Sequence, residues 1–101
     1  MVIYISGKIT GLFDYKEKFD AVEEKLKKQR HTILSPMIFP LGLTYDNYLT
    51  LAYAMIDCCD AIYMLDNWQD SKGAKLEYEY ASKMNKLLFY DKINENLKIN
   101  K

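Results

Sequence analysis

The chain has 101 residues, 50% of them hydrophobic and 28% charged, with 14 basic and 14 acidic side chains. A chain of this length and composition can bury a core of its own and form one globular domain. The balanced charge argues against a nucleic-acid polymer as partner, and no apolar run is long enough to span a bilayer, so no membrane partner is expected either.

The first third of the chain predicts a strand and a helix. Residues 2–6 form a β-branched apolar run typical of a buried strand, and they lack the basic region and cleavage site of a signal peptide. A loop punctuated by glycines follows. Residues 15 to about 29 predict a helix, because Tyr15, Phe19, Val22 and Leu26 share one apolar face. The opposite face, rich in Lys and Glu, is expected to be solvated surface.

The middle of the chain predicts a strand, a loop and a second helix. Residues 32–35 are expected to form the strand. Two prolines and a glycine within residues 36–43 indicate an irregular loop. The helix is expected to begin at Thr44 or Asp46 and to end near Cys58.

The remaining residues predict two further strands with a helix between them. The apolar run at residues 60–65 predicts a third strand, residues 73–85 a third helix, and residues 87–90 a fourth strand. The tail 91–101 is rich in Asn and Lys and predicts a short helix or a frayed end. Residues 1–90 are therefore expected to form the folded domain.

Strands that alternate with helices indicate the α/β class. We expect a three-layer, flavodoxin-like or Rossmann-like sandwich around a parallel sheet of four or five strands, with right-handed crossovers. If the strand order is 2-1-3-4, the order reverses between the first and third strands. Ligands of such sheets bind beyond the carboxyl ends of the strands at this reversal. The loops at residues 7–13 and 66–71 are therefore expected to meet at one crevice.

Cys58 and Cys59 are the only two cysteines of the chain. Neighbouring cysteines on a helix rarely bridge, and without further ligands they make a poor metal site. We interpret both as buried small hydrophobes in a reducing compartment, and we expect a cytoplasmic protein that binds no metal. His31 is expected at the surface, far from the crevice.

The most informative stretch is Ser71 to Glu77, at the start of the third helix. Ser71 is a good N-cap, and Gly73 keeps the first turn open to close approach. A helix N-terminus presents unpaired N–H groups that favour an anion. Glu77 falls on the inward stripe of this helix, which predicts a carboxylate aimed at the crevice. The alternative is a Glu at the edge of the stripe that reaches solvent or pairs with Lys75 or Lys83.

The two loops offer further polar and aromatic groups. Two glycines four residues apart after the first strand are weak support for phosphate binding, and a turn that needs permissive backbone explains them equally well. Trp68 could stack on a base or simply pack in the core. No Ser/His or Cys/His pair has spacing that suits a hydrolase triad. A carboxylate chemistry remains, in which a Glu attacks a sugar carbon that develops positive charge.

Four segments together resemble one protein family. They are residues 4–11 (YISGKITG), 54–57 (AMID), 59–65 (CDAIYML) and 71–81 (SKGAKLEYEYA). The resemblance is to the small, often phage-encoded family DUF4406, grouped with the nucleoside 2-deoxyribosyltransferase-like superfamily, and it covers nearly the whole chain up to Tyr90.

This resemblance implies a function and a set of site residues. The superfamily includes nucleoside deoxyribosyltransferases and 2'-deoxynucleoside 5'-phosphate N-hydrolases, which implies that Glu77 attacks the anomeric carbon and expels the base. No metal or organic cofactor is required. The implied substrate is a nucleoside or nucleotide. The residues expected to bind it, from both loops, the first strand and the third helix, are Tyr4, Ser6, Gly7, Gly11, Asp66, Trp68, Ser71, Gly73 and Ala74.

One departure from the superfamily pattern leaves an alternative open. The enzymes carry a further Asp on the helix before the third strand, and the matching position here is near Ala52. Asp46 or Asp57 would then have to supply the acid–base function. A non-catalytic module that binds a nucleotide or nucleoside is the alternative function. A small structural or interaction protein is a third possibility.

The resemblance also implies a homodimer or higher homo-oligomer. The second and third helices carry the tyrosines that we expect to be exposed for such an interface, which are Tyr45, Tyr48, Tyr53 and Tyr80.

Overall fold

A computed structural model of the protein describes residues 1–91. Its elements are β1 (Val2–Ser6), α1 (Tyr15–Lys28), β2 (Thr32–Leu34), the short 3-10 helix η1 (Pro36–Ile38), α2 (Tyr45–Asp57), β3 (Ala61–Met64), the 3-10 helix η2 (Trp68–Asp70), α3 (Lys72–Lys83) and β4 (Leu87–Tyr90). Each predicted strand and helix of this part of the chain is present, with bounds within two residues of the expectation. The predicted helical or frayed tail falls, beyond Asp91, outside the described residues.

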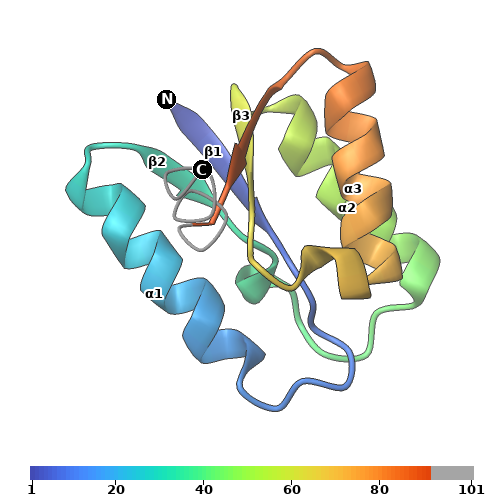
Figure 1. The fold of residues 1–101 in the computed structure, drawn as a ribbon. Helices are drawn as coiled ribbons and strands as arrows, with labels where there is room; N and C mark the ends of the chain where they lie inside the picture. The colour runs from blue at the N-terminus through green and yellow to red at the C-terminus, as the bar shows by residue number, and fades with distance from the viewer. Residues whose placement is uncertain (92–101) are drawn as a thin grey trace, which may run out of the picture.

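The four strands form one parallel sheet in the order β2-β1-β3-β4, as predicted (Figure 1). Ile3 on β1 pairs with Ile33 on one side and with Ala61 on the other. β3 in turn pairs with β4 from Ala61–Leu87 onward. The order therefore reverses between β1 and β3. No fifth strand is present among residues 1–91.

Helices cover both faces of the sheet, so the protein has three layers (Figure 1). Strand side chains alternate between the faces, because successive residues of a strand point in opposite directions. Ile3 and Ile5 pack against Phe19 on the α1 side. Tyr4 and Ile62 pack on the side of α2 and α3. None of the described helices is long and apolar enough to cross a membrane.

The two helices α1 and α3 end in the same way. The residue after each C-cap has a left-handed backbone, with φ of 70° at Arg30 and 59° at Asn85. The next N–H then donates back to a carbonyl of the last turn, from His31 to Leu26 and from Lys86 to Ala81. This is the Schellman arrangement, which glycine occupies most readily and asparagine next. Arg30 adopts it at a steric cost.

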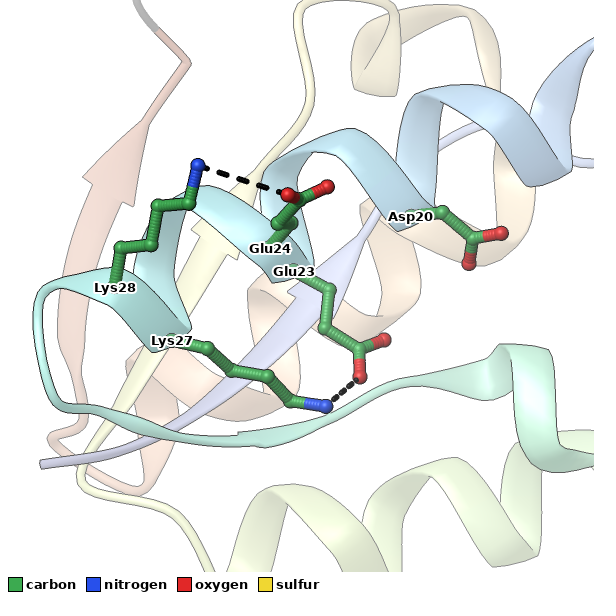
Figure 2. Close-up of a pocket in the computed structure, with 5 residues that line it drawn as sticks. All are labelled: Asp20, Glu23, Glu24, Lys27 and Lys28. Atoms are coloured by element: carbon green, nitrogen blue, oxygen red, sulfur yellow. Dashed lines mark ion pairs between the residues drawn. The ribbon is translucent and has the colours of Figure 1, made fainter.

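The charged face of α1 is exposed, as predicted. Ion pairs one turn apart join Lys27 to Glu23 at 2.7 Å and Lys28 to Glu24 at 3.6 Å (Figure 2). Asp20, whose carboxylate points away from these pairs, is bound instead by Lys16 at 2.8 Å. Solvent screens exposed pairs of this kind, so they add little to stability.

The prediction that both cysteines are buried is wrong for Cys58. Cys59 is 3% exposed and packs with the α2–α3 side of the core, whereas Cys58 is exposed at the end of α2. Adjacent residues at a helix end point in different directions, so only one of the two can face the core. Burial raises the pKa of the Cys59 thiol to about 12, and this thiol stays protonated. His31 is half-buried, with a ring nitrogen 3.1 Å from the amino terminus.

Candidate functional site

The loops after β1 and β3 meet, as the strand order requires. The Lys8 N–H donates to the Asn67 side-chain oxygen at 3.1 Å, and the Leu65 N–H donates to the Ser6 carbonyl at 2.8 Å. Gly7 packs directly against Leu65, because a Cβ added to Gly7 would lie 2.6 Å from Leu65 Cδ1. Gly7 is therefore a close-approach glycine, and it fixes the backbone at the mouth of the crevice.

A pocket of about 270 Å³ opens at this edge of the sheet. Its walls come from the loop after β1, the start of α2 and the start of α3. The lining residues are Gly7, Ile9, Thr10, Leu43, Tyr45, Tyr48, Ser71, Gly73 and Ala74. Four of the predicted site residues thus line it, although Gly7 is more than sixty positions away in the chain from the other three, Ser71, Gly73 and Ala74.

The N-terminus of α3 forms one wall of this pocket. Ser71 has an extended backbone, and its hydroxyl accepts a hydrogen bond of 3.1 Å from the Ala74 N–H, so Ser71 is the N-cap that the sequence predicts. The nearest atoms to a Cβ added to Gly73 would be the Tyr45 hydroxyl at 3.7 Å and Ser71 Oγ at 3.9 Å, which is ordinary contact. The fold therefore does not require glycine at position 73, and the missing side chain leaves room in the pocket.

Glu77 lies one turn of α3 beyond the pocket wall and points into the protein. Its side chain is 2% exposed, and the Ser6 hydroxyl donates a 2.6 Å hydrogen bond to its Oε1. The alternative of a solvated or lysine-paired Glu77 is wrong, since none of the ion pairs among residues 1–91 involves this side chain. Glu77 is a buried acid that a hydroxyl holds in place.

Burial sets the protonation of Glu77. Desolvation of the carboxylate raises its pKa from 4.5 to about 7, and the nearby hydroxyls of Ser6 and Tyr4 act in the opposite direction. No cation among the described residues contributes to this balance. The group therefore exchanges between its acid and carboxylate forms close to neutral pH.

Two tyrosines surround this carboxyl group. Tyr4 of β1 is fully buried beside Glu77 and Tyr48, and its hydroxyl has no hydrogen-bond partner of good geometry among residues 1–91. Tyr48 of α2 is half-buried and lines the pocket. Burial raises the pKa of both phenols, and the proximity of Glu77 raises it further, so both stay protonated.

Five predicted binding residues lie outside the pocket lining: Tyr4 and Ser6, which lie beside Glu77, and Gly11, Asp66 and Trp68. Gly11 is exposed with φ of 79°, which supports the explanation of this glycine as a turn residue. Asp66 is exposed. Trp68 stacks on Tyr78, with ring centroids 4.5 Å apart and an interplanar angle of 26°, so its ring packs within the protein.

The two candidate acids of α2 do not line the pocket either. Asp57 lies at the opposite end of α2 from Tyr45, and its Oδ1 accepts a 2.6 Å hydrogen bond from Tyr80. Asp46 is exposed in the first turn of α2. Ala52, near the position where the resemblance implied an acid, is fully buried. None of the side chains of α2 therefore presents a carboxylate to the pocket.

The structure adds site residues that the sequence analysis assigned elsewhere. Tyr45 and Tyr48 line the pocket, although both were predicted as exposed residues of an oligomer interface. Tyr45 is 48% exposed, whereas Tyr48 is half-buried, and Tyr53 and Tyr80 stack on each other at 4.3 Å. The sequence did hold an indication that Tyr48 faces inward, because it lies one turn before Ala52 on the same side of the helix.

A larger hollow, of about 460 Å³, lies on the outer face of α1 and is no competing site (Figure 2). Its lining consists of charged side chains, most of which pair with each other along the helix. Among residues 1–91, no group of three or more His, Cys, Asp or Glu side chains is placed to hold a metal ion.

Comparison with known proteins supports the fold and gives the family. A solved structure described as 2-desoxiribosyltransferase from Leishmania mexicana is similar, with a TM-score of 0.71 and 23% sequence identity. The similarity covers 88% of this chain and 62% of that one, so this chain spans slightly less than two thirds of its length. No curated protein matches the sequence. The family described as Domain of unknown function (DUF4406) matches residues 1–90, and the chain therefore belongs to this family.

Proposed function

We propose that the pocket binds a 2'-deoxynucleoside or its 5'-monophosphate and that Glu77 cleaves or transfers the N-glycosidic bond. The observation behind this role is the buried carboxyl group of Glu77, held by Ser6 one helical turn from the wall formed by Gly73 and Ala74. An acid buried without a cation is costly to a fold. Such groups with a perturbed pKa concentrate at functional sites. The fold that this chain shares with the Leishmania mexicana 2-desoxiribosyltransferase agrees with this choice of substrate.

The reaction would proceed in two displacements at the anomeric carbon. One Glu77 oxygen bonds to C1′ of the sugar while the bond from C1′ to the base nitrogen breaks, and the electron pair leaves with the base, which takes up a proton from solvent. Water then attacks C1′, loses a proton, and releases the sugar and the free carboxylate. A second base in place of water would give transfer instead of hydrolysis.

The start of α3 suits the other end of such a ligand. The Ser71 hydroxyl is engaged by the Ala74 N–H, and the earlier N–H groups of the helix, at Lys72 and Gly73, have no carbonyl within the helix to bind. These donors and the helix dipole would favour a sugar hydroxyl or a 5'-phosphate. The absence of a side chain at Gly73 would let that group approach the backbone.

Chromatographic detection of free base tests this function. The protein should release base from at least one member of a panel of 2'-deoxynucleosides and their 5'-monophosphates. Glu77→Gln should lower the rate by several orders of magnitude, because it removes the nucleophile and keeps the size of the side chain. Glu79→Gln is the matched control, since Glu79 is exposed on the same helix and should not affect the rate. A wild-type rate retained by Glu77→Gln would contradict the role of Glu77.

One observation favours the alternative of a non-catalytic binding module. Neither Asp46 nor Asp57 lines the pocket, so the described site holds a single carboxylate. A module of this kind would show a ligand-induced rise in melting temperature with no release of base. The rise should be smaller in Gly73→Val, whose side chain would occupy the pocket.

The outer face of α2 and α3 is the surface that we propose for a homo-oligomer. These helices carry Tyr45 and Leu51, which are 48% and 42% exposed, and the stacked pair of Tyr53 and Tyr80. Aromatic residues are enriched at such interfaces. Light scattering coupled to size-exclusion chromatography should give a mass above that of one chain, and Leu51→Glu should lower it toward the monomer.

A further inference from the structure

The Glu77 carboxyl group and the pocket are separated by side chains. Glu77 is 2% exposed and does not line the pocket. The groups that do face the pocket in this region are Gly7, Ala74 and Tyr48. Gly7 follows Ser6, which binds Glu77, and Ala74 lies one turn before Glu77 on α3. Gly7 and Ala74 have no side chain that could rotate to uncover Glu77.

Tyr48 differs from these neighbours because it is a side chain that can rotate. Its ring lines the pocket, while its hydroxyl lies beside Tyr4 and within electrostatic range of Glu77. Tyr48 comes from α2, whereas Glu77 comes from α3. The Tyr48 ring can therefore rotate while the backbone of α3, which holds Glu77, stays in place. The buried Tyr4 hydroxyl beside Tyr48 has no hydrogen-bond partner of good geometry within residues 1–91.

From this arrangement we propose that the Tyr48 ring gates the route from the pocket to Glu77. With the pocket empty, the ring closes the route and keeps water from the carboxyl group. A ligand that enters the pocket displaces the ring, and its sugar then faces Glu77. This inference rests on the proposed function of Glu77, and it adds a positioning residue that acts by controlling access.

Phe39 holds the gate in its closed position. Its ring packs edge-on against that of Tyr48, with centroids 5.4 Å apart and an interplanar angle of 87°. Phe39 is the C-cap of η1, in the loop that leads toward α2, and it is half-buried. An edge-to-face pair of this kind contributes to the preferred ring orientation. Removal of Phe39 should therefore loosen the gate without a change in Tyr48 itself.

Carboxyl labelling tests the gate without any need for catalysis. A water-soluble carbodiimide with glycine ethyl ester converts accessible carboxyl groups to amides, and peptide mass spectrometry locates them. Trypsin cleavage after Lys75 and Lys83 releases residues 76–83, which hold both Glu77 and the exposed Glu79. The ratio of labelling at these two residues is thus an internal measure within one peptide.

The expected results distinguish the role of the Tyr48 ring from that of the Tyr48 hydroxyl. In the wild-type protein Glu79 should be labelled and Glu77 nearly unlabelled. Tyr48→Ala should raise the ratio of Glu77 to Glu79 labelling severalfold, whereas Tyr48→Phe should leave it unchanged because the ring is kept. Phe39→Ala should raise the ratio to a smaller extent, and it serves if Tyr48→Ala does not fold. Glu77 labelled as readily as Glu79 in the wild type, or a ratio unchanged in both alanine variants, would overturn the gate.

The base-release assay on the same preparations distinguishes the gate from the proposed function. If the labelling changes as expected but no variant releases base, the gate stands and the catalytic role of Glu77 fails. If the wild type releases base but the labelling ratio does not change in either alanine variant, the gate fails and the catalytic role stands.

Discussion

Ser6 and Glu77 are 71 residues apart in the chain, yet the Ser6 hydroxyl donates a 2.6 Å hydrogen bond to the Glu77 carboxyl group inside the protein. The bond joins the end of β1 to the middle of α3. Both side chains are almost fully buried, with 0% and 2% exposure. Water does not compete for this bond, so its loss should be felt both in stability and in the pKa of Glu77.

Ser6→Ala should destabilise the protein, and more strongly at higher pH. The hydroxyl stabilises the ionised form of Glu77, so its removal should raise the pKa of this group further above about 7. The loss should reach about 1–3 kcal/mol where Glu77 is ionised, since a buried charge then lacks its donor. Urea unfolding of the wild type and of Ser6→Ala at several pH values measures this loss of stability. Ser82→Ala, at an exposed serine of α3, should change the free energy of unfolding little at any pH.

Glu77→Gln should remove a loss of stability that the wild type suffers as the pH rises. Between its ordinary pKa of 4.5 and its folded value of about 7, Glu77 holds a proton in the folded state but not in the unfolded state. Stability therefore falls as the pH rises through this window, and the penalty is complete above it. The difference between these two pKa values corresponds to a loss of about 3 kcal/mol in the free energy of unfolding, at 1.36 kcal/mol per pKa unit.

Unfolding free energies at about pH 5 and about pH 8 give the comparison. The wild type should lose stability over this range relative to Glu77→Gln, while Glu79→Gln should follow the wild type. Parallel curves for the wild type and Glu77→Gln would mean that the folded-state pKa of Glu77 is close to its ordinary value.

Gly73→Ala should stabilise the fold and weaken ligand binding at the same time. The helix gains about 0.5–1 kcal/mol from the replacement of glycine, and the new methyl group meets only atoms 3.7 Å or more away. The same methyl group would narrow the pocket. The melting temperature without ligand should rise, and the further rise on addition of the bound nucleoside should shrink. Gly42→Ala is the contrast, since φ of 95° makes a side chain there costly and the melting temperature should fall.

Arg30→Gly should stabilise the protein by about 1 kcal/mol. Arg30 has φ of 70° after the end of α1, a conformation that costs a residue with a Cβ roughly 1–2 kcal/mol. Part of the gain is lost again because glycine makes the unfolded chain more flexible. Gln29→Gly, at φ of −87°, should destabilise instead. The melting temperatures of the two variants test this prediction. A lower melting temperature in both would contradict the argument from the backbone conformation.

The sequence alone predicted the elements and favoured the inward direction of Glu77, and it limited the strand order to a few arrangements, of which 2-1-3-4 was the expected one. Each of these follows from local rules. Apolar runs mark buried strands, a 3.6-residue period marks the covered face of a helix, and right-handed crossovers restrict the strand order. The family resemblance was equally local, because it was carried by short motifs, and the match over residues 1–90 confirms it.

Only the tertiary structure decided which side chains meet at the pocket. Tyr48 and Glu77 lie on different helices, and their proximity depends on how α2 and α3 pack side by side on the sheet (Figure 1). The same packing pairs Asp57 with Tyr80 at the far end of these helices and stacks Tyr53 on Tyr80. Periodicity tells which face of a helix is buried, but not which partner a side chain finds there, because that depends on the relative positions of elements distant in the chain.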